Sequence, residues 1–151
     1  MLLFLTRIGL GWVMFYAGIT KVLNPNWSAA GYLKGAKTFN DFFVSLTEPG
    51  ILPFINFMNE WGLTLLGVSL ILGIGVRLSS VLGALLMVLY YFPALDWPKI
   101  GTTSYIIDDH IIYALVLLYL GAVRAGRMMG MENWFAKTFL SRYPRFQNIF
   151  G

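Results

Sequence analysis

The chain has 151 residues, of which 58% are hydrophobic and 12% are charged. Soluble domains are about 45–50% apolar and about 25% charged, so the composition excludes an ordinary soluble protein and predicts an integral membrane protein of one domain. Cysteine is absent and His110 is the single histidine, which excludes disulfides, iron–sulfur ligation, Cys-based zinc sites and a bis-histidine haem held within one chain. We therefore expect no metal site. The net charge of +4 is attributed to the positive-inside rule rather than to a nucleic-acid partner.

Four apolar stretches are each long enough to cross a bilayer, which takes about 20 mostly apolar residues. They cover residues 2–23, 53–75, 78–95 and 105–123. Backbone groups in hydrocarbon must be satisfied within a helix or a closed barrel, so we predict an all-α, four-helix transmembrane domain over residues 1–123. The first stretch carries Arg7 and lacks a small-residue cleavage site, so it is expected to be a retained span rather than a signal peptide.

The connections between these spans differ in length. The long segment between the first two is expected to hold an interfacial helix in the first outer loop, because Ser28 is a suitable N-cap and apolar residues follow it. These residues are Tyr32, Phe39, Phe42, Phe43 and Leu46. The sequence GVRLSS around Arg77 leaves a very short turn, so the second and third spans should form an antiparallel hairpin.

Residues 124–151 are expected to form an amphipathic cytoplasmic tail on the inner leaflet, with Met131, Trp134, Phe135 and Phe139 near one helical face. Four spans place both termini on one side. That side holds Arg7, Arg77, Arg124, Arg127, Lys137, Arg142 and Arg145 against Glu132. The opposite side holds four lysines and six acidic residues. Both termini should therefore be cytoplasmic, in a multi-pass protein of the cell membrane.

Polar residues of three spans are expected to share one layer near the outer surface. In the first span, a stripe at steps of three and four residues runs from Arg7 to Lys21 through glycines that would let another helix approach closely. A helix rises about 1.5 Å per residue. Lys21 and His110 therefore each lie about 21 Å from the arginine at the opposite end of their own span, and Glu60 lies about 25 Å from the arginine of its span. The three side chains should therefore lie at one depth.

Lys21, Glu60 and His110 are the candidate catalytic residues. A charged group at this depth is costly unless it is paired or faces water, so Lys21 and Glu60 could pair, or both could be helix-end residues that reach the surface. His110, beside acids and Tyr113, could relay protons to a redox ligand, or it could be a hydrogen-bonded packing residue. Asp108 and the aspartate that follows it suit the first turn of a helix with no site at all.

Aromatic residues at the outer end of the third span form either an interfacial belt or the wall of a site for a flat ring such as a quinone. They are Tyr90, Tyr91, Phe92 and Trp97. The candidates for cofactor binding are Arg7, Tyr90, Tyr91, Trp97 and Tyr113. The expected cofactor is a quinone, with no haem, iron–sulfur cluster or Cys-based metal site.

Four segments occur in order over nearly the whole chain: TRIGLGWVMFYAGITKVLNP, AAGYLKGA, EWGLTLLGVSLILGIGVRLSSVLGALL and GRMMGMENW. Together they resemble the DoxX/DoxD family of small four-helix membrane proteins. The positions that match the family pattern are Arg7, Lys21, Glu60 and Arg77, and one departure is Glu132, where the family commonly has Asp. AGYLKGA favours the DoxD branch, which includes the small subunit of thiosulfate:quinone oxidoreductase. The resemblance implies a membrane subunit that works with soluble or peripheral redox partners.

The leading interpretation is a membrane subunit of a quinone-linked oxidoreductase, of which the thiosulfate:quinone type is the nearest example, bound to a protein subunit partner. A non-catalytic membrane anchor or scaffold is an alternative, in which the tail and the long first loop would be docking surfaces. A small transporter is a third, disfavoured because no inverted repeat is obvious. The glycine-bearing faces could also pack copies of the chain into a homo-oligomer.

Overall fold

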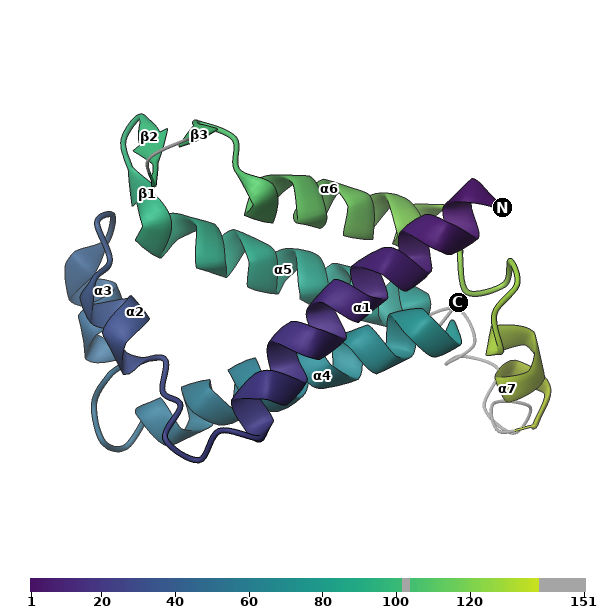
Figure 1. The fold of residues 1–151 in the computed structure, drawn as a ribbon, viewed down its shortest axis with the longest axis horizontal. Helices are drawn as coiled ribbons and strands as arrows, with labels where there is room; N and C mark the ends of the chain where they lie inside the picture. Colours follow the sequence, from purple (N-terminus) through teal and green to yellow (C-terminus); the bar gives the residue numbers. More distant parts are fainter. Residues whose placement is uncertain (102–103, 139–151) are drawn as a thin grey trace.

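The computed structural model of the protein describes residues 1–101 and 104–138. The helices are α1 (Leu2–Val22), α2 (Ala30–Lys34), α3 (Asn40–Ser45), α4 (Leu52–Leu72), α5 (Val76–Ala94), α6 (Asp109–Ala122) and α7 (Glu132–Thr138), and the strands are β1 (Leu95–Asp96), β2 (Lys99–Ile100) and β3 (Ser104–Tyr105). The strands pair antiparallel in the order β1-β2-β3. They lie with α2 and α3 at one end of the long helices, which we call the strand end (Figure 1). The N-terminus and α7 lie at the opposite end, the α7 end.

Within the described residues, three helices are long and apolar enough to cross a membrane, namely α1, α4 and α5. Helix α6 has 14 residues, about 21 Å of helix against a hydrocarbon core of about 30 Å. The predicted start of the fourth span at residue 105 is wrong, because Tyr105 belongs to β3 and Ile106 has a φ of 62°. A left-handed backbone does not continue an α-helix. Ile106 and Ile107 therefore lie in a turn, and α6 begins at Asp109.

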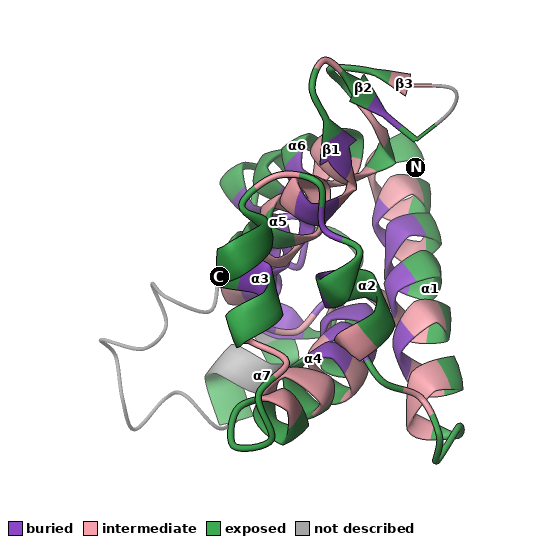
Figure 2. Ribbon diagram, turned by 90° about the vertical axis from the view of Figure 1, so that its left-hand side faces the viewer, coloured by how far each residue is buried: buried purple, intermediate pink, exposed green. Residues whose placement is uncertain are grey.

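The long helices pack mainly as two pairs, α1 with α4 and α5 with α6. The buried stripe predicted along the first span is confirmed. Four of its predicted members, Arg7, Gly11, Met14 and Gly18, are buried together with Leu10, while Lys21 at its end is half-buried (Figure 2). A Cβ on Gly18 would overlap the backbone nitrogen of Thr64, and a Cβ on Gly67 would overlap the backbone of Phe15. Each glycine thus receives the partner's backbone, which is how small residues bring membrane helices together.

The chain reverses between α4 and α5 over Gly73 and Gly75, whose φ values are 68° and 65°. These left-handed conformations are available to glycine at little cost. The predicted short turn is confirmed, although α4 packs far more on α1 than on α5.

The segment between α1 and α4 folds over the strand end and forms a second small core. Its buried residues are Ala29, Leu33, Ala36 and Phe43. The backbone N–H of Lys37 donates to the carbonyl oxygen of Pro93 at 3.1 Å, and the hydroxyl of Thr38 donates to that of Leu95 at 2.6 Å. These bonds supply donors to carbonyl oxygens at the end of α5, where no N–H group of the helix is left to pair with them. The predicted interfacial helix is therefore two short helices, and α3 is exposed except at Phe43 (Figure 2).

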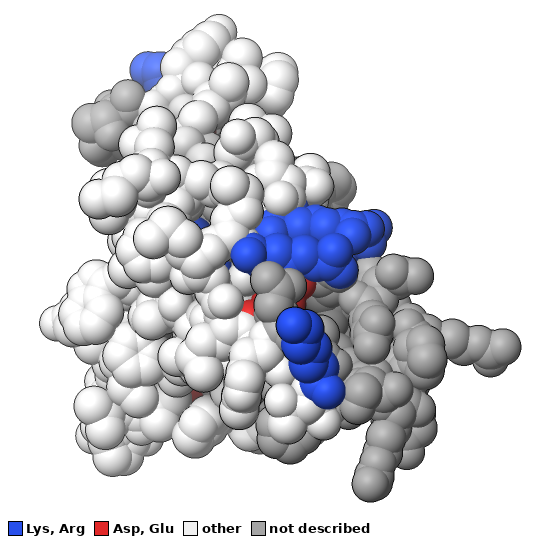
Figure 3. Space-filling model, turned by 90° about the vertical axis from the view of Figure 1, so that its right-hand side faces the viewer, with Lys and Arg blue, Asp and Glu red and all other residues white. Residues whose placement is uncertain are grey.

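After α6 the chain turns back across the α7 end, where the backbone N–H of Met131 donates to the carbonyl oxygen of Leu72 at 3.1 Å. Basic side chains gather on this face (Figure 3). The exposed ones are Arg77, Arg124, Arg127 and Lys137. Of the predicted apolar face of the tail, Met131 and Trp134 are exposed. The side chains of Phe135 and Phe139 lie outside the described part of the chain, as do Arg142 and Arg145.

Candidate functional site

Seven side chains meet at the strand end around Tyr90 of α5, and we call them the Tyr90 site. They are Lys21, Trp27, Tyr32, Asn59, Tyr90, Asp108 and His110. Lys21 lies in α1, Asn59 in α4 and Tyr90 in α5. His110 lies in α6, and Asp108 is the N-cap of that helix. Two more come from the segment that follows α1. The site is therefore built where the two helical pairs and the second core meet.

Lys21 in the last turn of α1 points its ammonium at two aromatic rings. Its Nζ lies 4.9 Å from the ring centroid of Trp27 and 5.5 Å from that of Tyr90. A cation over an aromatic face is stabilised by about 0.5–2 kcal/mol, more when water is excluded. The ring faces therefore hold the ammonium within the site at half-burial.

His110 is oriented by the residue that starts its helix. The carboxylate of Asp108 accepts the backbone N–H groups of His110 at 3.1 Å and Ile111 at 3.3 Å, so Asp108 is the N-cap of α6. Its other oxygen lies 2.6 Å from Nδ1 of His110. The expectation that Asp108 belongs to a helix start is confirmed. The same carboxylate fixes the imidazole, whose ring centroid lies 5.9 Å from that of Tyr90 in an edge-to-face contact.

Tyr90 is held at both its hydroxyl and its backbone. Its hydroxyl donates to Oδ1 of Asn59, a residue that is 9% exposed. The hydroxyl of Tyr32 donates to the carbonyl oxygen of Tyr90 at 2.5 Å, and the two rings meet edge to face. Burial raises the pKa of Tyr32, and the charge of Asp108 raises it further. Tyr32 therefore remains a hydrogen-bond donor, and it ties α2 to α5.

Glu60 lies near the site without entering it. It interacts electrostatically with Lys21, yet no ion pair within 4 Å joins these two described side chains. Of the two alternatives for Lys21 and Glu60, direct pairing is not seen, and the ammonium of Lys21 lies over aromatic rings. Glu60 is half-buried, and its carbonyl oxygen accepts the hydroxyl of Thr64 at 2.7 Å.

The other predicted binding residues lie apart from the site. Tyr91 donates from its hydroxyl to the carbonyl oxygen of Ile106 at 2.6 Å. Trp97 is 72% exposed beside the strands. Tyr113 lines a groove further along α6, and Arg7 lies at the α7 end, 14 residues or about 21 Å along α1 from Lys21.

Four members of the site are not among the predicted site residues. The sequence places Tyr32 in an interfacial helix and Asp108 in the first turn of a helix, and it gives no role to Asn59 or Trp27. A weak signal existed in the segment NPNWSAAGY, whose two aromatic residues follow Lys21 closely. Their positions depend on how the loop folds over the helices, which periodicity does not report.

A second cluster of charged groups is buried at the α7 end. Arg7 is 1% exposed, and it donates from Nη1 to the carbonyl oxygen of Ala125 at 3.0 Å and from Nη2 to that of Met129 at 3.1 Å. Glu132 is 4% exposed and lies 3.7 Å from Nε of Arg127. Burial raises the pKa of Glu132, and the backbone N–H of Val76 and nearby arginines, including Arg127 and Arg7, oppose this rise. We call this group the Arg7 cluster.

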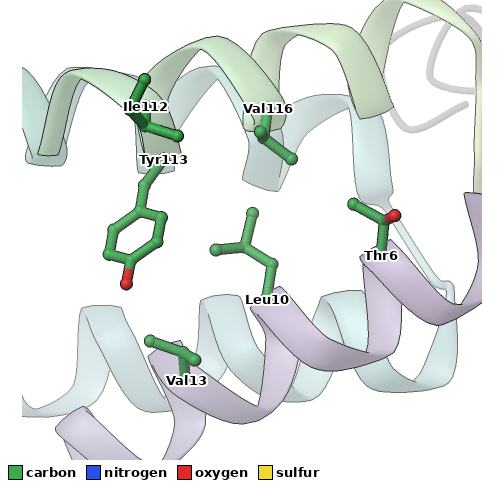
Figure 4. Close-up of a pocket in the computed structure, with 6 residues that line it drawn as sticks. All are labelled: Thr6, Leu10, Val13, Ile112, Tyr113 and Val116. Carbon is green, nitrogen blue, oxygen red and sulfur yellow. The ribbon is translucent and has the colours of Figure 1, made fainter. Parts of the chain in front are cut away.

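An open groove of about 230 Å³ runs between α1 and α6 (Figure 4). It is lined by Thr6, Leu10, Val13, Ile112, Tyr113 and Val116. The ring of Tyr113 extends from α6 toward Val13 of α1. Since α1 and α6 contact each other only sparsely, the groove is a seam between the two helical pairs.

With three helices long and apolar enough to cross a membrane among its described residues, and a polar site at one end of them, the chain is a small helical membrane protein. Within the described residues, no three His, Asp or Glu side chains gather as a metal site would require. The model of the DoxX family matches residues 2–94, and the chain belongs to this family. Neither the curated proteins nor the solved structures gave a match to the chain.

Proposed function

We propose that the protein is the membrane subunit of a quinone-linked oxidoreductase and that a quinone ring binds in the Tyr90 site. The main support is Lys21, whose ammonium lies over the rings of Trp27 and Tyr90 while the imidazole of His110 meets an edge of Tyr90. Flat apolar walls with a few convergent polar groups suit a planar ligand that carries carbonyl oxygens. The thiosulfate:quinone type is the finer form of this proposal, and it rests on the resemblance to the DoxD branch.

In this proposal α6 is the fourth span, both termini are cytoplasmic, and the strand end faces the outside of the cell membrane. The orientation is supported by the exposed Arg77, Arg124 and Arg127 at the α7 end (Figure 3), because cytoplasmic loops carry an excess of Lys and Arg. The 14 residues of α6 would cross a locally thinned bilayer, at a modest energetic cost.

The residues of the Tyr90 site fit the groups that a quinone presents. A quinone accepts two electrons and two protons on reduction to a quinol. Lys21 can donate a hydrogen bond to a carbonyl oxygen, since an ammonium has three donors. His110 can hold or pass a proton at Nε2, because Asp108 occupies the Nδ1 side of its ring. The electrons would come from the redox partner that the family resemblance implies, and Glu60 would add negative charge beside Lys21.

Fluorescence quenching tests the proposal, since a bound quinone quenches a nearby indole. Protein in nanodiscs would be titrated with a benzoquinone whose ring carries no tail. We expect saturable quenching that is lost in Trp27→Phe and kept in Trp97→Phe, because Trp97 is an exposed tryptophan of the same end. Lys21→Met should weaken binding, whereas Lys34→Met, at an exposed position of α2, should not. Quenching that never saturates, or that is equal in both tryptophan variants, would exclude a quinone in this site.

A non-catalytic anchor is the second candidate, and the exposed side chains of Met128, Met129, Met131 and Trp134 at the α7 end support it. Methionine-rich surfaces adapt to partners of different shape. In that case a partner protein should be captured equally by wild type, Lys21→Met and His110→Ala. Capture would be lost when residues 127–151 are deleted.

A further inference from the structure

We propose that the groove between α1 and α6 binds the first part of the isoprenoid tail of a membrane quinone whose ring lies in the Tyr90 site. This inference rests on the proposed function and deepens it, because it assigns the substrate to the lipid-soluble, tailed quinones. It also gives the route of access, from the bilayer sideways between the two helical pairs.

The size and lining of the groove suit a chain rather than a ring. Its volume of about 230 Å³ is below the range of about 300–1,000 Å³ for pockets that enclose a whole ligand. The lining is almost wholly hydrocarbon, with Leu10, Val13, Ile112 and Val116 as its aliphatic part. No charged side chain lines it, and its polar groups are the hydroxyls of Thr6 and Tyr113, so a charged head group would find no ion-pair partner there.

Both walls of the groove lead to the Tyr90 site. On α1, the spacing of three and four residues that joins Leu10 to Val13 continues to Lys21, about 12 Å beyond Val13. On α6, steps of three residues join Val116 to Tyr113 and Tyr113 to His110, which is about 4.5 Å further along the helix. The residues at the far ends of these walls, Lys21 and His110, are the two that the proposed function places against the quinone ring.

The seam is open because its two helices belong to different pairs. Helix α1 packs on α4 and α6 packs on α5, whereas α1 and α6 meet only weakly. Val13 is exposed at the groove, and Ile112 is exposed on the opposite wall. The ring of Tyr113, part of the lining, lies across the seam toward Val13 (Figure 4), and His110 precedes Tyr113 by three residues on α6. A chain that lies in the groove would therefore pass Tyr113 as it joins a ring near His110.

Lipid tails are as apolar as the groove, so the groove contributes shape and close packing rather than hydrophobic driving force. The test therefore has to report where the tail lies and not only how tightly the ring binds. A quinone with a photoreactive diazirine in the first unit of its tail would be bound to the protein in nanodiscs and activated by light. Labelled peptides would then be identified by mass spectrometry.

The expected result is labelling of residues 6–13 and 112–116 that an excess of the same quinone without diazirine removes. Val116→Trp, which fills the groove, should lose this labelling, while Leu115→Trp, at an exposed neighbouring position of α6, should keep it. Quenching at Trp27 by the tailless ring should be the same in both variants, which shows that both are folded.

Three outcomes would overturn the inference while the proposed function stands, each with saturable ring quenching intact. In the first, the label spreads over all lipid-exposed faces. In the second, a phospholipid with a diazirine in its acyl chain labels the groove, and quinone does not compete with it. In the third, a second copy of the chain covers the groove and leaves it unlabelled. Absence of saturable ring quenching in the wild type would instead remove the proposed function itself.

Discussion

Arg7 donates a hydrogen bond of 3.0 Å to the carbonyl oxygen of Ala125, 118 positions later in the sequence. The second turn of the first spanning helix thus holds the segment that follows the last long helix. The same guanidinium donates to the carbonyl oxygen of Met129, and the planar fork of arginine is suited to holding two acceptors at once.

Replacing this arginine should release the segment between α6 and α7. In Arg7→Gln the carbonyl oxygens of Ala125 and Met129 lose their donors, and in Arg7→Lys the charge stays but the fork is lost. We expect faster trypsin cleavage after Arg124 and Arg127 in both variants, with Arg7→Gln the faster. Cleavage after Lys34 and Lys37 at the strand end is the internal control and should not change. Unchanged cleavage after Arg124 would show that Arg7 does not hold this segment.

The stability of the α7 end should depend on pH through Glu132. Burial raises the pKa of this carboxyl above its ordinary value, which is about 4.3. The protonated form is thus favoured in the folded state, and this contribution is full below the ordinary pKa and is lost as the pH rises through the raised folded-state value. The melting temperature of the wild type should therefore fall relative to that of Glu132→Gln as the pH is raised from acidic values. A rise relative to Glu132→Gln would show that attraction to the arginines outweighs burial.

The close contact of α1 with α4 should not tolerate even one methyl group. Because a Cβ at Gly18 would overlap the backbone of Thr64, Gly18→Ala should destabilise the protein by about 1–3 kcal/mol as the helices are forced apart. Gly9→Ala is the matched control, because a Cβ there meets nothing within 4 Å. It should be neutral or stabilising by up to about 1 kcal/mol, since glycine is unfavourable within a helix. Equal effects of the two substitutions in unfolding measurements would refute the contact.

Removing the hydroxyl of Tyr90 should destabilise the strand end while leaving its ring in place. In Tyr90→Phe the buried Oδ1 of Asn59 loses its donor, which costs about 1–3 kcal/mol. Tyr91→Phe removes an exposed hydroxyl bond to Ile106 and should cost less. Unfolding free energies of the two variants decide this. Lys21 and His110 contact the ring rather than the hydroxyl of Tyr90, so quinone quenching should survive in Tyr90→Phe and be lost in Tyr90→Leu.

Substitutions of Asp108 should separate its role as the N-cap of α6 from the effect of its charge on His110. Asp108→Ala removes the acceptor for two backbone N–H groups and should cost about 0.5–2 kcal/mol. Asp108→Asn keeps an acceptor and should be close to the wild type in stability, yet it removes the charge beside His110. Asp109→Ala, at an exposed position of the first turn, is the control. If Asp108→Asn is as unstable as Asp108→Ala, the charge rather than the cap stabilises α6.

The sequence predicted α1, α4 and α5 closely, because the length of an apolar run and the satisfaction of its backbone decide where such helices lie. It failed at the start of α6, where the apolar run includes Ile106 and Ile107. The backbone of the strand segment places both residues in a turn, and isoleucine is not a residue that predicts a turn. The buried face of α1 was predicted because the spacing of Arg7 and Gly18 reports a helical face directly.

The site was predicted in part for the same reason. A fixed rise per residue places Lys21 and His110 at one depth, and both reach Tyr90. The direction in which Lys21 points is set by Trp27 and Tyr90, and no helical count gives the position of a loop residue such as Trp27. The roles assigned to these side chains remain predictions until binding is measured.

The division of the long helices into consecutive pairs also sets an order of assembly during biosynthesis. Helix α1 can reach its glycine-lined partner once α4 leaves the ribosome, and α5 can pair with α6 in the same way. The buried guanidinium of Arg7, however, finds its acceptors only after Ala125 and Met129 have been made. Until then the nascent domain carries an unsatisfied cation beside the lipid. A product that stops before residue 125 would keep that defect, because it lacks both acceptors.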